Sequence, residues 1–332
     1  MANLPEDLEN LKGQPAALVE LTTRREALSR PEGYKPDAKL VDAIKVALLL
    51  RKPLLVTGRP GTGKTELGHY LAWKMGLSAG EGVHRYAYQF DSKSNSIARD
   101  LFYTYDAIGH YRAGGEIRPF LSFNALGRAL LRCARPTDEL KELLPEFDTS
   151  KPGHVARQSV VVIDEIDKAP RDFPNDLLNE IDRSYFHIQE LKNLKVEADR
   201  VKAPILVITS NSEKNLPAAF LRRCVYYDIE PHSEKELREI VSIRLTEFAD
   251  ANGALLKSAV EKFGLLARED SGMKHKPGTA ELLDWLAALL GRGAQLDVEL
   301  NKQGELMKAT YAALVKSQED RAVAKKILEE TE

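Results

Sequence analysis

Eight residues at positions 58–65, Gly-Arg-Pro-Gly-Thr-Gly-Lys-Thr, combine glycines, a lysine and a hydroxyl in an order suited to binding phosphate. They fit the pattern G-x-x-x-x-G-K-[ST], known as Walker A. Glycines let backbone N–H groups turn toward an anion, and the following helix offers its positive end. Lys64 can reach the terminal phosphates of a nucleotide, and Thr65 can hold Mg²⁺. The predicted nucleotide-binding residues are Gly58, Arg59, Pro60, Gly61, Thr62, Gly63, Lys64, Thr65 and Glu66.

A second chemical element is Val-Val-Val-Ile-Asp-Glu at 160–165, where four apolar residues lead directly into two carboxylates. The apolar run predicts a strand buried on both faces, as in a parallel sheet. Ligands gather at the carboxyl ends of such strands. We therefore expect Asp164 to hold Mg²⁺ through water, and Glu165 to orient and deprotonate the attacking water. For Asp167 and Lys168 we expect an ion pair on the surface.

A third element is Asn211, which ends the apolar segment Pro-Ile-Leu-Val-Ile-Thr-Ser-Asn at 204–211. Its amide could hold the lytic water or the terminal phosphate. An Asn at this place can also be a turn residue. Its position relative to the other two strand ends favours a functional role.

The elements that must position these residues follow from hydrophobic patterning. Helical spacing predicts a helix at 40–50, and a second helix after the glycine loop. Apolar or alternating runs predict strands at 54–58, 83–90, 160–164, 204–211 and 224–231. Residues 186–196 resemble a hairpin, and the long stretch 91–158 is expected to be mostly helical with polar breaks. Strands that alternate with helices, followed by a helical block, predict an α/β domain with a parallel sheet and a smaller α-helical domain.

The predicted organisation is an N-terminal helical appendage at 1–33, an α/β domain at 34–231 and a helical domain at 232–332. The 332 residues carry 48 basic and 50 acidic side chains, a formal net charge of −2. This balance does not suggest a surface built for nucleic acid. Two cysteines without a CxxC spacing and seven scattered histidines support neither a disulfide framework nor a zinc site. Without a secretory signal or a membrane-length apolar run, a cytoplasmic location is expected.

Four motifs in this order, "GRPGTGKT", "VVVIDEID", "ITSN" and "LPAAFLRRC", resemble the AAA+ ATPases. In that family they are Walker A, Walker B, sensor 1 and the arginine finger. The first and last, with the segment from Tyr34 to Thr65, look most like the MoxR-type and dynein-related branch. The resemblance spans about residues 34–330.

This resemblance implies a P-loop NTPase fold with a helical lid, an ATPase that uses ATP and Mg²⁺, and a homo-oligomeric ring, usually hexameric. It also implies that each site lies at a subunit boundary. Arg223 aligns best with the finger that reaches the neighbour's γ-phosphate, and Arg222 is the alternative. A helical insertion within 105–130 is similar in place to one that faces the pore of the ring. In the lid, Glu281 stands nearest the position of the sensor 2 arginine, and Lys276 is the basic candidate close by.

Three functions are compatible with these features. The favoured one is a MoxR-type ATPase that remodels a protein partner, through a von Willebrand factor A-type adaptor. The second is a nucleic-acid motor or loader of the same fold, for which the only short basic cluster is at 273–277. The third is a non-catalytic nucleotide-binding scaffold, against which the presence of both Glu165 and Arg223 argues.

Overall fold

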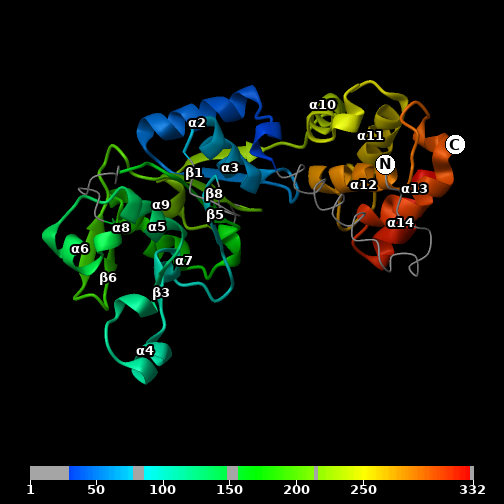
Figure 1. Ribbon diagram of the computed structural model, residues 1–332. Coiled ribbons are helices and arrows are strands. Elements are labelled where there is room, and N and C mark those ends of the chain that lie inside the picture. Colours follow the sequence, from blue (N-terminus) through cyan, green and yellow to red (C-terminus); the bar gives the residue numbers. More distant parts are fainter. Residues whose placement is uncertain (1–29, 78–85, 148–155, 213–215, 330–332) are drawn as a thin grey trace. The chain divides into compact units, whose positions relative to one another are not determined.

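The structure is a computed structural model that describes residues 30–77, 86–147, 156–212 and 216–329 (Figure 1). Within these residues the chain forms two compact units. The α/β unit comprises 36–58 and 64–229, and the helical unit comprises 30–35, 59–63 and 230–329. Most of the expected appendage at 1–33 lies outside the described residues, and its last three form a 3-10 helix, Pro31–Gly33.

A five-stranded parallel sheet forms the centre of the α/β unit. Its strand order is β2-β5-β8-β1-β9, and every neighbouring pair is parallel. The strands are β1 (Leu54–Gly58), β2 (Tyr88–Asp91), β5 (Val160–Asp164), β8 (Ile205–Thr209) and β9 (Val225–Ile229). The predicted parallel sheet is confirmed. The strand expected at 83–90 starts at Tyr88 among the described residues, and 83–85 lie outside them.

Helices cover both faces of this sheet. On one face, α3 (Lys64–Lys74) packs on β1, β5 and β8. Gly68 allows a close approach there, because a Cβ at this position would lie 2.1 Å from Val162 Cγ2. On the other face, α5 (Ala125–Arg132) packs on β2 and β5, where Leu130 and Val161 share one buried cluster. Helix α2 (Ala38–Leu50) lies along β9.

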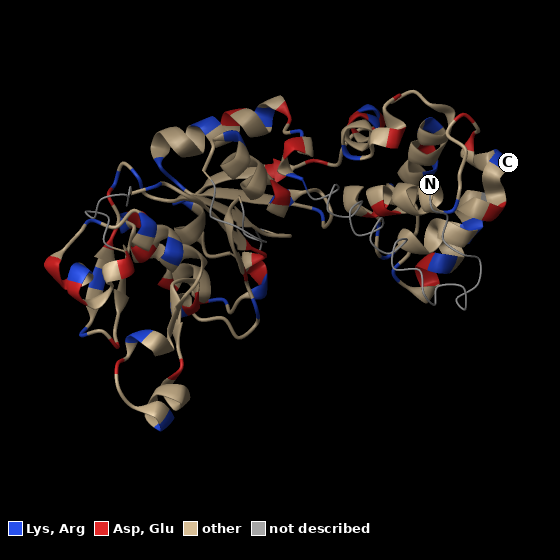
Figure 2. Ribbon diagram, in the orientation of Figure 1, with Lys and Arg blue, Asp and Glu red and all other residues tan. Residues whose placement is uncertain are grey.

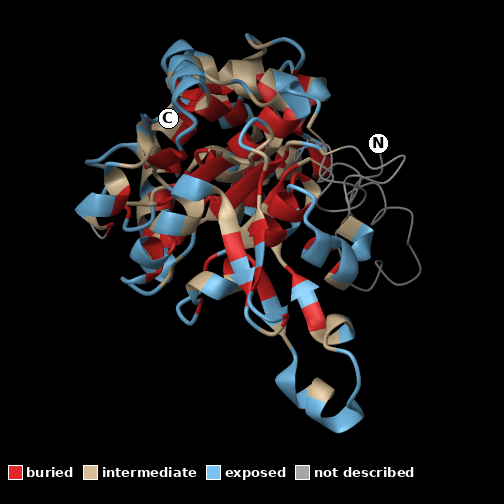
Figure 3. Cartoon of the chain, turned by 90° about the vertical axis from the view of Figure 1, so that its left-hand side faces the viewer, coloured by how far each residue is buried: buried red, intermediate tan, exposed pale blue. Residues whose placement is uncertain are grey.

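Two hairpins are inserted in the chain between successive strands of the main sheet. One pairs β6 (Tyr185–Ile188) with β7 (Leu194–Glu197), which confirms the hairpin expected at 186–196. The other pairs β3 (Tyr103–Tyr105) with β4 (Leu121–Phe123), and α4 (Ala107–Ala113) lies between them. Figure 3 shows that this last segment is mostly exposed, and α4 buries no residue.

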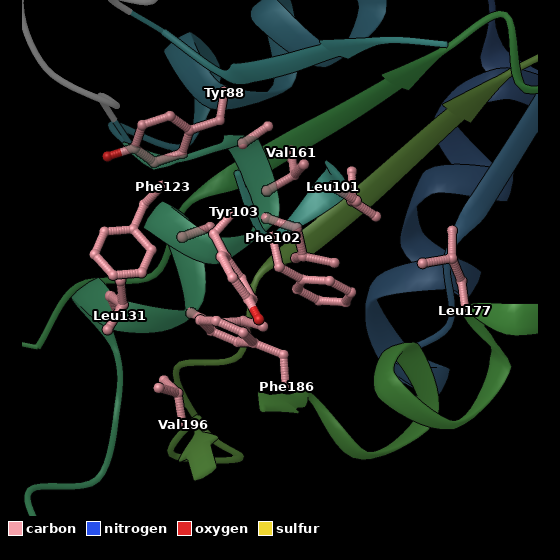
Figure 4. Close-up of a cluster of buried hydrophobic side chains, with 14 of the residues drawn as sticks. Tyr88, Leu101, Phe102, Tyr103, Phe123, Leu131, Val161, Leu177, Phe186 and Val196 are labelled. Carbon is pink, nitrogen blue, oxygen red and sulfur yellow. The ribbon is translucent and has the colours of Figure 1, made fainter. Parts of the chain in front are cut away.

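The β3–β4 hairpin corrects the expectation that 91–158 is mostly helical. Its strands form because Tyr103 and Phe123 are buried in the core of the α/β unit (Figure 4). Phe102 stacks on Phe186 of β6 with ring centroids 5.1 Å apart, and the Tyr103 hydroxyl donates to Glu190 at 2.8 Å. Contacts between the two insertions therefore override the local helical tendency. The remaining helices of this unit are α6 (Asp138–Leu143), α7 (Phe173–Asp176), α8 (Leu178–Arg183) and α9 (Ala218–Leu221).

The helical unit has its own core, and its described residues contain no strand. Its helices are α10 (Glu234–Arg244), α11 (Ala254–Ala267), α12 (Thr279–Gly291), α13 (Gly304–Thr310) and α14 (Gln318–Glu329). Trp285 is fully buried at its centre and donates its indole N–H to Thr310 at 3.1 Å. A Ser233–Glu236 capping box starts α10. None of the helices in the described ranges combines the length and hydropathy needed to cross a membrane.

A buried carboxylate ties a loop of this unit to α14. Asp320 is 1% exposed and accepts hydrogen bonds from the backbone N–H of Lys274 at 2.6 Å and from the Ser317 hydroxyl at 2.8 Å. It also accepts from His275, through the backbone and the ring. Burial by itself would raise the pKa of Asp320, but these donors outweigh it and lower the pKa to about 2. The ionised carboxylate is thus the form that the fold stabilises.

Candidate functional site

The glycine loop connects β1 to α3, in the strand, loop and helix order that the motif requires. Gly58, Gly61 and Gly63 have φ values of 143°, 76° and 86°. Side chains rarely adopt such backbone conformations, which explains why glycine occupies these positions. Helix α3 starts at Lys64, so the N–H groups of its first turn, at the positive end of the helix, directly follow the loop. Thr65 and Glu66 lie in its first turn, half-buried.

The Asp164 carboxylate lies at the carboxyl end of β5 and is the centre of a hydrogen-bond network. Its Oδ1 accepts from the hydroxyl of Thr65 at 2.8 Å and from the hydroxyl of Thr209 at 2.5 Å. The two residues predicted from sequence to hold Mg²⁺ are therefore in direct contact. The sheet brings about this meeting, because β5 lies beside β8, and α3 packs on both strands.

Glu165 adopts an unusual backbone conformation immediately after β5. Its φ is 50°, in the left-handed region that is costly for a residue other than glycine. The backbone N–H of Glu165 donates to the Thr209 hydroxyl at 2.8 Å, which holds this turn in place. Its Oε1 accepts from the Asn211 side-chain amide at 3.4 Å, and its Oε2 pairs with Lys168. The ion pair of Lys168 is thus with Glu165.

This contact corrects the expected Asp167–Lys168 surface pair. Asp167 accepts instead from the backbone N–H of Asn211 at 3.2 Å. Asn211 therefore contacts the segment after β5 twice, through its backbone and through its side chain. The Asn211 amide thus reaches the carboxylate of Glu165, which directly follows the neighbouring strand β5.

The lysine of the loop is buried in an acidic environment. Lys64 is 7% exposed, and its ammonium donates to the carbonyl oxygen of Gly58 at 2.9 Å. Burial lowers the pKa of Lys64 below its ordinary value, while Asp164, Asp167 and Glu165 partly offset this effect by attraction. A phosphate bound at this place would be stabilised by the positive charge of Lys64.

The two arginines expected to act as a finger lie after α9 and differ in their surroundings. Arg223 is half-buried, and its Nε donates to Asp182 Oδ2 of α8 at 2.7 Å. A second donor of the same guanidinium contacts the carbonyl oxygen of Ala219 at 3.0 Å. Arg222 is exposed. Among the described residues, neither arginine joins the network around Asp164.

In the helical unit, the residues considered for sensor 2 are engaged in local contacts. Glu281 accepts from the backbone N–H of Gly278 at 3.0 Å and so caps α12. Lys276 pairs with Glu269 at 3.1 Å, and Arg59 of the glycine loop pairs with the same Glu269. Within this unit Gly61 also accepts a hydrogen bond from the backbone N–H of Ala280 at 3.2 Å. The expected basic candidate is therefore already paired with an acidic residue.

Sequence reasoning missed two residues of this region. Thr209 is fully buried at the end of β8 and bonds both Asp164 and Glu165, so it is the common element of the network. The signal in the sequence was its place: Thr209 is a polar residue at the end of an apolar strand, two positions before Asn211. Asp182, the partner of Arg223, lies 41 positions away from it and carries no local signal.

The fold and these contacts define a P-loop nucleotide-binding protein. The family model for the AAA domain (dynein-related subfamily) matches residues 53–224, which is more than half of the chain. The chain belongs to this AAA family of ATPases.

Solved structures of RuvB from Thermotoga maritima are similar to part of this chain. One mutant form is 16% identical with a TM-score of 0.45, and the match covers 82% of this chain and 68% of that one. Another mutant form is 15% identical with a TM-score of 0.46, and the match covers 88% of this chain and 74% of that one. A third structure, named as a Holliday junction branch migration motor, is 15% identical with a TM-score of 0.43 and covers 98% of this chain and 79% of that one. No curated protein matches the sequence.

Proposed function

We propose that this chain is a ring-forming ATPase of the MoxR type within the AAA+ proteins. Its ATP turnover drives the remodelling or assembly of a protein partner, in a chaperone-like manner. The observation that carries the proposal is the network of Thr65, Asp164, Glu165 and Asn211, in which Thr209 joins Asp164 to Glu165. Each of the four is of a type that nucleotide hydrolysis requires.

In this proposal the glycine loop and Lys64 bind the phosphates of ATP, and Thr65 and Asp164 hold Mg²⁺. The donor set fits this ion, since a hydroxyl and a carboxylate oxygen lie 2.8 Å apart. Mg²⁺ prefers oxygen ligands and usually keeps water and phosphate oxygens in the rest of its coordination shell. Bound there, the ion would neutralise charge on the phosphates.

Glu165 is the proposed general base. Its carboxylate accepts the proton of the attacking water, and Asn211, whose amide lies 3.4 Å from Oε1, orients that water or the terminal phosphate. Lys168 pairs with the other oxygen and so fixes the orientation of the carboxylate. The strained backbone of Glu165 supports this role, because such conformations cluster at functional sites.

The active form is proposed to be a homo-oligomeric ring, hexameric as is usual for the family. Arg223 acts as the finger toward a neighbouring subunit, with Arg222 as the alternative. In the isolated chain Asp182 holds Arg223, so assembly must exchange this contact for the neighbour's phosphate. The exposed Arg222 needs no such exchange.

A protein partner is proposed in preference to nucleic acid. Basic and acidic residues are interspersed in both units (Figure 2), and the formal net charge is −2. Phosphate backbones are usually bound by a continuous basic surface. A von Willebrand factor A-type adaptor and a cytoplasmic location are part of the same proposal.

The decisive experiment is the Glu165→Gln variant. Loss of a general base lowers turnover by about 10²- to 10⁴-fold. We expect this loss in steady-state ATP hydrolysis, with ATP binding retained and an ATP-bound ring accumulating in sedimentation. The matched control is Glu142→Gln on the exposed face of α6, which should hydrolyse ATP at the normal rate.

Normal turnover by Glu165→Gln would refute the assignment of the base. A wild-type protein that binds ATP without hydrolysing it would identify a scaffold instead. Salt-sensitive stimulation of turnover by nucleic acid would favour the nucleic-acid motor.

A further inference from the structure

A cavity lies at the amino ends of the strands in the α/β unit. It has a volume of about 450 Å³, within the range typical of small-ligand sites. It is lined by Pro53, which directly precedes β1, and by Ile205, the first residue of β8. The network around Asp164 is at the other ends of the strands, and five residues of strand separate the two by roughly 16 Å. The cavity is therefore distinct from the proposed nucleotide site.

The floor of this cavity is apolar. Leu126 and Leu130 of α5 and Leu206 of β8 line it, and they are 2%, 1% and 8% exposed. These side chains belong to the core cluster of the unit, so the floor is held by the packing of the sheet. An apolar group of a ligand would find a preformed surface there.

The rim of the cavity is basic. Arg51, Lys52, Arg183 and Arg200 line it, and all four are exposed. Arg51 and Lys52 donate to the backbone carbonyl oxygens of Arg200 and Arg222, at 2.9 and 3.2 Å, which fixes their direction without neutralising their charge. Four cations at one opening attract an anionic group.

Two carboxylates line the cavity, and they differ in their pairing. Asp182 is neutralised by Arg223 at 2.7 Å. The Oε2 atom of Glu180 is buried and has no hydrogen-bond partner among the described residues. A buried oxygen without a partner is costly, and a donor on a ligand would satisfy it.

We infer that this cavity is a binding site for a small organic anion with an apolar body and an N–H or O–H donor. The anion faces the four rim cations, the apolar body covers the leucine floor, and the donor bonds Glu180. Asp182, which lines the cavity, also holds Arg223, so the ligand lies next to the candidate finger. The site is independent of the nucleotide.

The test uses 8-anilinonaphthalene-1-sulfonate, a fluorescent probe that carries an apolar body, a sulfonate and an N–H donor. The full chain is titrated without nucleotide, and N-phenyl-1-naphthylamine serves as the same probe without the anion. We expect saturable binding of the sulfonate probe and weaker binding of the neutral one. The double variant Arg183→Glu/Arg200→Glu should bind the sulfonate probe about tenfold more weakly, from two reversed exposed charges.

The matched control is Arg112→Glu/Lys192→Glu, with the same change of charge at two exposed positions outside the cavity. It should bind the sulfonate probe as the wild type does. The inference would be overturned if the rim variant bound the sulfonate probe as tightly as the wild type does. It would also be overturned if the control variant lost as much affinity as the rim variant, or if no saturable binding were observed. If the double rim variant loses its helical circular dichroism, the single variants Arg183→Glu and Arg200→Glu give the same comparison. Because no ATP is present, a negative result here leaves the proposed ATPase unaffected.

Discussion

The Thr209→Val variant tests the network around Asp164 most directly. Valine keeps the shape of threonine but lacks its hydroxyl, which donates to Asp164 at 2.5 Å and accepts from the backbone N–H of Glu165 at 2.8 Å. The variant therefore removes one donor from the proposed metal-binding carboxylate. It also removes the acceptor that holds the strained turn of Glu165. Thr209 is a positioning residue in this scheme, since it acts through its two neighbours.

The size of the effect follows from these contacts. A hydrogen bond to a charged group contributes about 1.5–3 kcal/mol. A difference of about 1.4 kcal/mol is tenfold in rate, so loss of positioning in the transition state lowers kcat by roughly 10- to 100-fold. The KM for ATP should change little, because in the proposed site the phosphates are bound by Lys64 and the loop backbone. Asp164 keeps the Thr65 hydroxyl, but the Mg²⁺ concentration that gives half-maximal turnover should rise.

The assay is steady-state ATP hydrolysis at varied ATP and Mg²⁺, together with thermal unfolding. Thr209→Ser, which keeps the hydroxyl, should restore most of kcat and the Mg²⁺ dependence. A merely structural role would lower the melting temperature of both variants and leave the Mg²⁺ dependence unchanged. Wild-type kcat in folded Thr209→Val would refute the reasoning.

Two further predictions concern the ring and the helical unit. A finger supplied by a neighbour contributes about 10³- to 10⁵-fold in rate, so inactive Arg223→Ala subunits should regain turnover when mixed with Lys64→Ala subunits. The same mixing with Arg222→Ala shows which arginine acts. If turnover recovers in neither mixture, catalysis between subunits is contradicted. The pKa of Asp320 is depressed from 3.8 to about 2, so its contribution to stability is present above pH 4 and is lost as the pH falls toward 2. Thermal unfolding should show that Asp320→Asn lowers the melting temperature at pH 7 and flattens its fall on acidification, whereas exposed Asp297→Asn should do neither.

The sheet could be predicted from sequence because its strands are short apolar runs with clear ends. The runs that start at Leu54, Val160 and Ile205 are buried on both faces, and each is followed by polar or glycine residues. The β3–β4 hairpin could not be predicted in this way. Each of its strands has three residues, too few for an alternating pattern to be visible. Contacts with a segment more than eighty positions away, such as that of Phe102 with Phe186, hold it in place.

The candidate site likewise contains some contacts that could be predicted from the sequence and others that could not. Asp164 and Asn211 could be placed together because Asp164 ends one strand of the parallel sheet and Asn211 follows its neighbour. The partner of Lys168 could not be predicted, since this contact depends on the left-handed conformation of Glu165. That conformation turns the chain back, and the N–H of Lys168 bonds the carbonyl oxygen of Glu165 at 2.9 Å. A glutamate gives no local signal for such a turn.

The two inserted hairpins are separate from the main sheet. Strand β3 pairs with β4 and β6 with β7, and none of the four joins the main sheet. Most backbone groups of these strands are satisfied within each hairpin, and the carbonyl oxygen of Glu197 in β7 accepts from the N–H of Arg135 at 2.8 Å. The order of the five parallel strands does not depend on these bonds. Homologues could lengthen, shorten or exchange the exposed segment around α4 without altering the register of the strands that carry the site. The fold thus permits one part of the surface to diversify rapidly in evolution while the chemical centre remains unchanged.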